Sequence, residues 1–244
     1  MEIIRSLENS RIKLYSSLKM KKYRDKNRLF IIEEKHLIQE ALKAERLKQL
    51  IIREGVENEF AVEGIYVSDD IMRKLSENNS LNDYIGICEI KQSNLKNDER
   101  LIILEDVQDP GNVGTIVRTA CCFGYDGVLL SNKCADIYNS KTIAACQGAL
   151  FSIAIIRDDI KNHLDYCKSH GITLYGTSLK ESNYLSAIKP DKRYALIFGN
   201  EGQGISAETL ARCNHNFKIE MDSFDSLNVA NAMAIASYYF RYHG

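Results

Sequence analysis

The chain has 244 residues, of which 45% are hydrophobic and 27% charged, and its formal net charge is −1. This composition is typical of a globular protein and excludes a disordered or collagen-like chain. A chain of this length accommodates a small domain followed by a larger one. The first residues lack the apolar segment of a signal peptide, and no apolar run reaches about 20 residues, the length of a membrane span.

The seven cysteines and five histidines are scattered along the chain, and no C-x-x-C pair occurs. Structural zinc sites need clustered Cys and His ligands, and disulfide frameworks belong to oxidising compartments. We therefore expect reduced thiols, no metal site, no membrane contact and a cytoplasmic location.

Residues 1–92 are expected to form a small α/β domain. Residues 10–28 combine a helix-like spacing of apolar residues with a basic face, on which Asp25 is the one acid. Such a cluster indicates contact with a polyanion, and the alternative is an ordinary solvated helix face. The basic residues are Arg11, Lys13, Lys19, Lys21, Lys22, Arg24, Lys26 and Arg28. The other expected elements are strands at 29–32, 50–52, 64–67 and 85–89 and helices over 33–46 and 69–76.

Residues 93–100 are almost devoid of apolar side chains and are interpreted as a linker to a second domain, residues 101–244. There, strands alternate with helices, which predicts a mostly parallel sheet covered on both faces. Ligands of such sheets bind beyond the carboxyl ends of the strands, where we place the loops 105–114, 198–205 and 220–228. The expected strands are 101–105, 127–131, 152–156, 172–179, 194–198 and 215–221, and the helices are 115–124, 141–151, 159–169, 206–213 and 226–240.

Three polar motifs fall in those loops. The first, residues 109–118, contains Asn112 in a Gly-containing loop and Arg118 on the following helix. The second, residues 198–204, places Glu201 among three glycines, which allow close approach of a ligand to the backbone. The third, residues 225–232, places Ser226 and Asn228 before an apolar helix, where Ser226 is expected to cap that helix.

In this order, N-x-G-x-x-x-R, G-N-E-G-x-G and S-L-N-V-A resemble the three motifs of the SpoU (TrmH) family of RNA ribose methyltransferases. The segment ADIYNSKTIAACQGALF is similar to the stretch that follows the first motif in that family. The N-terminal segment SLENSRIKLYSSLKMKKYRDKNRLFIIEEKHLIQEAL is similar to the family's ribosomal-protein-like substrate-binding domain. Glu220 and Ser223 stand where members usually have Pro and Gly.

The resemblance implies a homodimer whose C-terminal trefoil knot binds S-adenosylmethionine and which methylates a ribose 2′-hydroxyl of ribosomal or transfer RNA. It implies a catalytic region of Arg118, Asn112, Glu201, Ser226 and Asn228. It implies a cofactor site of Thr177, Ser178, Phe198, Gly199, Asn200, Gly202, Ile219, Met221 and Leu227. The basic N-terminal segment, represented by Lys19, Lys21, Lys22 and Arg24, is expected to hold the RNA phosphates.

The resemblance implies that Arg118 is the catalytic residue. A guanidinium keeps its proton at neutral pH, so we expect Arg118 to stabilise the developing alkoxide or to hold a phosphate rather than to act as a base. Three other functions stay open: a non-catalytic RNA-binding or assembly factor on the same scaffold, a knotted RNA base methyltransferase, and a generic nucleotide-binding α/β enzyme. The last lacks a phosphate-binding fingerprint.

Overall fold

The computed structural model describes residues 3–77, 79–180, 182–223 and 226–243. The chain divides into two compact units, Met1–Lys91 with Tyr138–Ile143, and Gln92–Ile137 with Ala144–Gly244. Within the described residues no helix combines the length and the apolarity needed to cross a membrane. None of the seven cysteines takes part in a disulfide.

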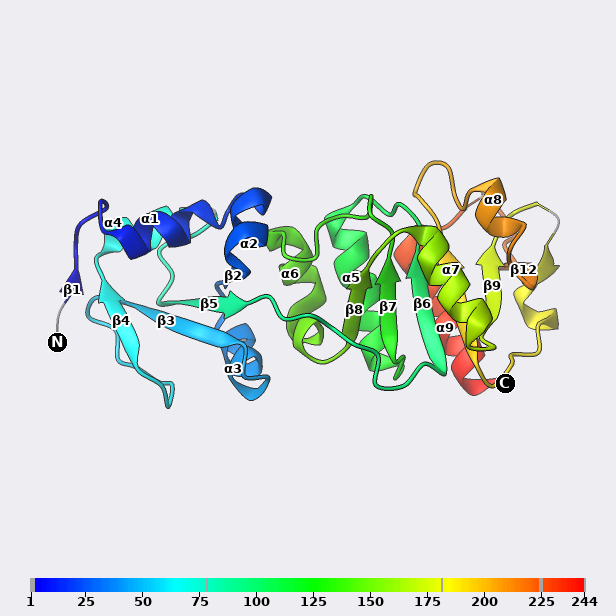
Figure 1. Cartoon of the computed structure of the whole chain (residues 1–244), viewed down its shortest axis with the longest axis horizontal. Coiled ribbons are helices and arrows are strands. Elements are labelled where there is room, and N and C mark those ends of the chain that lie inside the picture. Colours follow the sequence, from blue (N-terminus) through cyan, green and yellow to red (C-terminus); the bar gives the residue numbers. More distant parts are fainter. Residues whose placement is uncertain (1–2, 78, 181, 224–225, 244) are drawn as a thin grey trace. The chain divides into compact units, whose positions relative to one another are not determined.

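The first unit is built on a five-stranded mixed sheet (Figure 1). Ile51, Ile85 and Ile87 face a core shared with one pair of helices, whereas Leu50 and Ile52 alternate to the opposite face, as the pleat requires. In sheet order the strands are β1 (Ile3–Ile4), β4 (Gly64–Val67), β3 (Leu47–Arg53), β5 (Tyr84–Glu89) and β2 (Leu29–Ile32). The helices are α1 (Ser10–Ser17), α2 (Lys21–Asn27), α3 (Lys35–Lys43) and α4 (Asp69–Leu75).

The helix expected over residues 10–28 is in fact two helices, α1 and α2, separated at Leu18–Met20. Arg24 of α2 is only 5% exposed, and its Nη1 donates to the carbonyl oxygens of Leu18 and Lys19, both at 2.8 Å. A buried guanidinium that holds the backbone between two helices is a structural group. Arg24 therefore does not belong to the exposed basic face on which the sequence placed it.

The second unit contains a seven-stranded sheet in which neighbouring strands of the described residues are parallel, as expected. The central strands consist of buried apolar residues because helices cover both faces. In sheet order the strands are β10 (Asn183–Tyr184), β12 (His215–Lys218), β9 (Thr173–Thr177), β11 (Tyr194–Phe198), β6 (Arg100–Leu104), β7 (Gly127–Leu130) and β8 (Ala154–Arg157).

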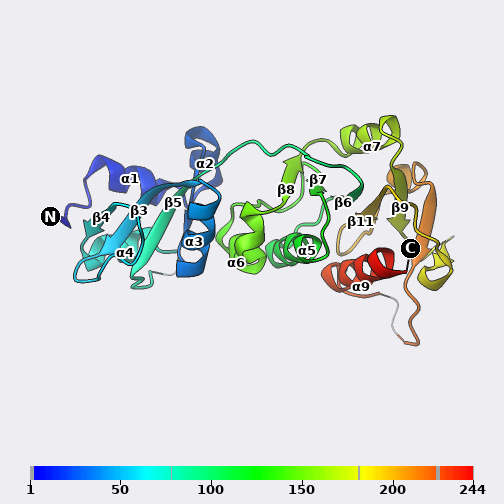
Figure 2. The same ribbon diagram turned by 90° about the horizontal axis from the view of Figure 1, so that it is seen from below.

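Helix α7 (Ile160–Ser169) covers one face of this sheet, and α5 (Pro110–Cys122) and α9 (Val229–Tyr242) cover the other (Figure 2). Helices α5 and α9 run side by side in the same direction. A hydrogen bond joins their first turns, from Asn228 to Asn112, and Arg241 Nε donates to the carbonyl of Phe123 at their last turns. The remaining helices are α6 (Ser140–Cys146), η1 (Gln147–Phe151), η2 (Leu185–Ala187) and α8 (Ala207–Leu210).

In the second unit, helices α5 and α9 begin several residues away from the positions that the sequence predicted. Helix α5 begins at Pro110 rather than 115, because the Asp109 side chain accepts from Asn112 N at 2.8 Å and Pro110 suits a first helical position. Asn112 thus lies in the first turn of α5, not in a loop. Helix α9 begins after Asn228, whose Oδ1 accepts from Ala230 N at 2.9 Å. Asn228, and not Ser226, is the N-cap.

Residues 92–99 form neither helix nor strand, but they are attached to the second unit. Leu95 packs against the core under α7, where it leaves no room for a side chain at Gly127. Asp98 accepts hydrogen bonds from Tyr166 Oη at 3.0 Å and from Arg193 Nη2 at 2.6 Å. The contacts of Leu95 and Asp98 therefore fasten most of the interpreted linker to the second unit.

Candidate active site at the carboxyl edge of the second sheet

The three sequence motifs meet at one edge of the seven-stranded sheet. The first follows β6, the second follows β11, and the third follows β12. Since these strands are parallel, their carboxyl ends lie at the same edge, which is where ligands of such sheets bind.

A chain of hydrogen bonds links all three motifs. Asn228 Nδ2 donates to Asn112 Oδ1 at 2.9 Å, and Asn112 Nδ2 donates to Glu201 Oε1 at 3.1 Å. The partners are 116 and 89 residues apart in the sequence. The fold has therefore brought together three of the five residues that the sequence assigned to catalysis.

The orientation of the Asn228 and Asn112 amides follows from the groups at the two ends of this series of hydrogen bonds. At one end, Asn228 Oδ1 accepts the cap bonds of α9, so its Nδ2 must face Asn112. At the other end, the Glu201 carboxylate can only accept, so Asn112 must present its Nδ2. Each amide nitrogen carries a second N–H. Both amide oxygens already accept a hydrogen bond and both amide nitrogens retain an N–H donor, which suits an oxygen that becomes negative.

Glu201 is a charged anchor at the start of α5. Its carboxylate accepts from the backbone N–H groups of Gln108 at 3.2 Å and Asp109 at 3.0 Å, besides Asn112. Burial raises the pKa of Glu201, but these hydrogen bonds lower it by more, so the net pKa lies below its ordinary value. Glu201 is thus ionised at neutral pH and cannot serve as a general base of pKa near 7.

Arg118 and Ser226 lie outside this network. Arg118 is exposed on α5, about 9 Å beyond Asn112 along the helix axis at about 1.5 Å per residue. It makes no hydrogen bond or ion pair with any residue that the structure describes. Ser226 is exposed and lies two positions before the cap of α9. Both side chains are exposed, as residues that meet a ligand or a second chain must be.

The second motif is a tight hairpin whose backbone leaves no room at Gly199. Asn200 and Gly204 exchange backbone hydrogen bonds of 3.1 and 2.8 Å. A Cβ at Gly199 would lie 2.1 Å from the Gly204 carbonyl carbon and 2.2 Å from Ile205 N. The Asn200 side chain shapes the turn, since its Oδ1 accepts from Gly202 N at 2.9 Å.

The residues expected to hold the cofactor lie at the ends of neighbouring strands. Thr177 ends β9 and Ser178 follows it. Phe198 ends β11 and Gly199 follows it. Ile219 and Met221 follow β12. Ile219 and Met221 are half-buried apolar residues, which is the kind of side chain that lines a pocket for an adenosyl group. The other expected residues are Asn200 and Gly202 in the hairpin and Leu227, which is partly exposed before α9.

Glu220, which stands where members of the SpoU family usually have Pro, attaches the loop after β12 to Ser186. Glu220 Oε1 accepts hydrogen bonds from the Oγ and the backbone N of Ser186, which lower the pKa of Glu220. Asp225, the first residue of the third motif, lies outside the described residues.

Among the described residues, no group of three or more His, Cys, Asp or Glu side chains is arranged to hold a metal ion.

Sequence reasoning overlooked two acids at the same edge, Glu105 and Asp106, which directly follow β6. Glu105 is 7% exposed and accepts from Ser206 Oγ at 2.7 Å and Thr209 Oγ1 at 2.9 Å. Consecutive acids after a buried apolar strand are the signal that could have identified them.

Two family models and a sequence relative match this chain. Residues 99–238 match the model of the SpoU rRNA methylase family, and residues 9–85 match that of the MRM3-like substrate binding domain. The chain is 32% identical over 247 aligned positions to the 23S rRNA (guanosine(2553)-2′-O)-methyltransferase RlmP of Bacillus subtilis, covering 99% of this chain and 100% of the relative.

Solved structures are also similar over nearly the whole chain. An AdoMet-bound rRNA methyltransferase from Sinorhizobium meliloti superposes with a TM-score of 0.88 at 28% identity, covering 99% of this chain and 98% of that one. An RNA 2′-O ribose methyltransferase superposes with a TM-score of 0.82 at 27% identity, covering 97% of each chain.

Proposed function

This chain belongs to the SpoU rRNA methylase family, and from this membership we infer that it transfers a methyl group from S-adenosylmethionine to a ribose 2′-hydroxyl of ribosomal RNA. The observation that carries the inference is the hydrogen-bond chain Asn228–Asn112–Glu201, which assembles the three motifs at one sheet edge. A 23S ribosomal RNA is the proposed substrate because a relative aligned over its full length is named for that reaction.

S-adenosylmethionine, when bound, supplies an electrophilic methyl group. The protein's task is then to position the ribose oxygen and to stabilise the charge that grows on it as its proton leaves. The spare N–H groups of Asn112 and Asn228 serve this purpose, with Glu201 holding Asn112 in place. Arg118 adds a permanent positive charge, and Ser226 a hydroxyl, at the edge of the same site.

A homodimer, built through the second unit, is part of this proposal. The exposed side of α9 carries Ile235, Tyr238 and Tyr242, which are 44%, 54% and 61% exposed. Their spacing forms one apolar stripe, which is typical of a helix that packs against another chain. Arg118 is exposed on the neighbouring α5, so we propose that a second copy places its groups next to Arg118. The trefoil knot in this unit and a cytoplasmic location, where ribosomal RNA is found, belong to the same proposal.

The first unit is proposed to hold the RNA through exposed cations on α1 and α2. Lys21 and Lys22 are exposed, although Lys21 also pairs with Asp25 at 2.6 Å. Lys19 is less available, because its Nζ donates to the Ser76 carbonyl at 2.5 Å. Cations of this kind bind phosphates and add affinity without choosing a sequence. The match to a substrate-binding family model over residues 9–85 supports this role.

The direct test is to incubate the purified protein with S-adenosylmethionine and 23S ribosomal RNA lacking its natural modifications. Nuclease digestion and mass spectrometry of the product should reveal one 2′-O-methylnucleoside. A methylated base would instead indicate a base methyltransferase. Binding of RNA without methylation, together with no calorimetric binding of S-adenosylmethionine, would indicate a non-catalytic assembly factor.

A further inference from the structure

A cleft of about 500 Å³ opens at the carboxyl edge of the second sheet, beside the hairpin that carries Glu201. It lies over Glu105 and Asp106 and is bordered by Lys133, Gln108 and Gln203, among others. The proposed catalytic network adjoins it directly, because the backbone N–H of Gln108 donates to Glu201 Oε2 at 3.2 Å. None of the motif residues expected to act on the ribose uses this cleft.

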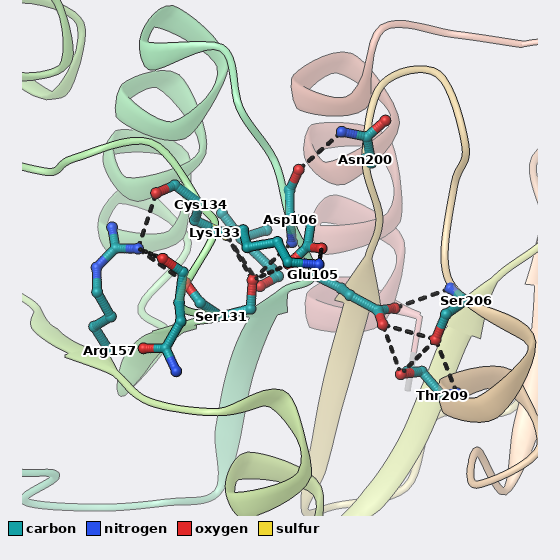
Figure 3. Close-up of polar contacts among 11 residues, drawn as sticks. Glu105, Asp106, Ser131, Lys133, Cys134, Arg157, Asn200, Ser206 and Thr209 are labelled. Atoms are coloured by element: carbon teal, nitrogen blue, oxygen red, sulfur yellow. Dashed lines mark hydrogen bonds and ion pairs between the residues drawn. The ribbon is translucent and has the colours of Figure 1, made fainter.

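The floor of the cleft is acidic and tightly held (Figure 3). Ser206 N donates to Glu105 Oε2 at 3.0 Å, in addition to the two hydroxyl groups that bond Oε1. Asp106 has a left-handed φ of 58°, and Asn200 Nδ2 donates to its carbonyl at 2.9 Å. A phosphate placed deep in this cleft would be repelled by two carboxylates. The floor instead suits a neutral group that offers N–H donors, such as the edge of a nucleobase.

The rim carries a cation on a loop that the protein holds in place. Arg157 Nη1 donates to the carbonyls of Ser131 at 2.9 Å, Asn132 at 3.2 Å and Cys134 at 2.8 Å (Figure 3). Lys133 extends from this loop with 76% of its side chain exposed, 3.2 Å from Asp106 Oδ2. An exposed ion pair of this kind is weak, so Lys133 can exchange Asp106 for a phosphate at little cost.

Two amide side chains at the rim have no partner among the residues that the structure describes. Gln108 and Gln203 are both exposed, and neither side chain makes a hydrogen bond there. Side-chain amides offer a donor and an acceptor together, which matches the edges of nucleobases. A phosphate-binding cation, free amides and an acidic floor thus lie around one cleft.

We propose that this cleft is a subsite for a nucleotide adjacent to the methylated one, with Lys133 on its phosphate and Gln108 and Gln203 on its base. The proposal rests on the proposed function, since it assumes that RNA reaches Glu201. It assigns sequence choice near the target to Lys133 and Gln108, which lie outside the three motifs, and to Gln203 within the second motif. Single-stranded or splayed nucleotides are the form in which RNA bases are recognised in this way.

The experiment compares binding of an RNA fragment that contains the methylated nucleotide to the wild-type protein, to Lys133→Ala and to the double variant Gln108→Ala/Gln203→Ala. We expect Lys133→Ala to weaken binding several-fold and to make the plot of log K against log salt shallower by about 0.7. Lys168→Ala is the matched control, since Lys168 is an exposed lysine in the last turn of α7, at the opposite edge of the sheet. It should bind as the wild type does.

A protein–RNA double-mutant cycle identifies the base. Abasic residues are introduced one at a time beside the methylated nucleotide. We expect one abasic position to weaken wild-type binding by at least about fivefold. The double glutamine variant should bind the intact RNA and the RNA with this abasic position almost equally. Equal binding of Lys133→Ala and wild type, or fully additive losses at every position, would overturn the subsite. Methyl transfer by the wild-type protein is measured on the same fragment, so failure of the proposed function is seen separately.

Discussion

At the scale of single residues, Asn228 has two tasks that different substitutions separate. Its Oδ1 caps α9, and its Nδ2 holds Asn112. Aspartate keeps the capping acceptor but loses the donor, whereas alanine loses both. We expect Asn228→Asp to lower methyl transfer at least about tenfold with little change in Tm. Asn228→Ala should show the same loss and lower the free energy of unfolding by about 1 kcal/mol, measured by urea denaturation. Equal activity of Asn228→Asp and wild type would show that the hydrogen bond from Asn228 to Asn112 has no part in the reaction.

Arg118 is expected to act on the reaction rather than on the fold, because it is exposed and makes no bond with the described residues. Arg118→Ala should abolish methyl transfer, while calorimetry shows S-adenosylmethionine affinity close to that of the wild type. Arg118→Lys keeps a charge but loses the planar fork, so it should recover only part of the rate. If the alanine variant turned over normally, Arg118 would have no part in catalysis.

We expect His163 to make the free energy of unfolding depend on pH between about pH 5 and 6.5, where most carboxylates are already ionised. It is 4% exposed, and its Nε2 lies 3.0 Å from the carbonyl of Leu130. Burial lowers the pKa of His163 below the ordinary 6.5. Well above pH 6.5 the His163 imidazole is neutral in both the folded and the unfolded state. Below it the unfolded state takes up a proton that the folded state resists, so the free energy of unfolding falls as pH falls.

The measurement is urea denaturation at pH 7, 6 and 5. His163→Gln keeps an N–H for Leu130 and cannot titrate. We expect this variant to lose less stability than the wild type between about pH 6.5 and pH 5. Parallel stability curves for the two proteins would exclude His163 as the source of the pH dependence.

At the scale of elements, the hairpin of the second motif depends on the absence of a side chain at Gly199. Its backbone approaches so closely that a Cβ would overlap Gly204 and Ile205, which cannot move aside as a flexible side chain can. Gly199→Ala should therefore lower the free energy of unfolding by several kcal/mol, at the upper end of ordinary single substitutions. Gly171→Ala, where a Cβ meets nothing within 4 Å, is the control and should cost only the strain of its φ of 65°. Similar losses in both would contradict the close-approach argument.

At the scale of elements, the sequence predicted the first residues of helices least well. The pattern of apolar residues places α5 and α9 correctly on the sheet, but capping side chains determine where each begins. Asp109 and Asn228 supply the caps, and neither choice is visible in apolar periodicity. The break between α1 and α2 was missed for a related reason. It depends on a buried Arg24 that bonds to the carbonyls of the connecting residues.

At the scale of the whole molecule, the apolar stripe on α9 predicts the oligomeric state. Light scattering should give about twice the chain mass of 27.7 kDa for the wild type. Ile235→Asp should give a monomer, because an exposed charge would have to be buried in the interface. If a second copy completes the site at Arg118, the monomer should also lose methyl transfer. Lys168→Glu is the control and should stay dimeric. An Ile235→Asp protein that keeps the dimer mass would place the interface elsewhere.

The sequence by itself determined the parallel sheet, the family and the residues of the three motifs. These depend on local patterns: strands and helices alternate, and Gly, Asn and Glu recur at set spacings within short segments. Tertiary structure alone decided which of those residues meet. Asn228 and Asn112 are 116 residues apart, and their bond exists because α5 and α9 begin side by side. The same contacts decided that Arg24 is structural and that Glu105 lies under a cleft, since burial is a property of neighbours that are distant in sequence.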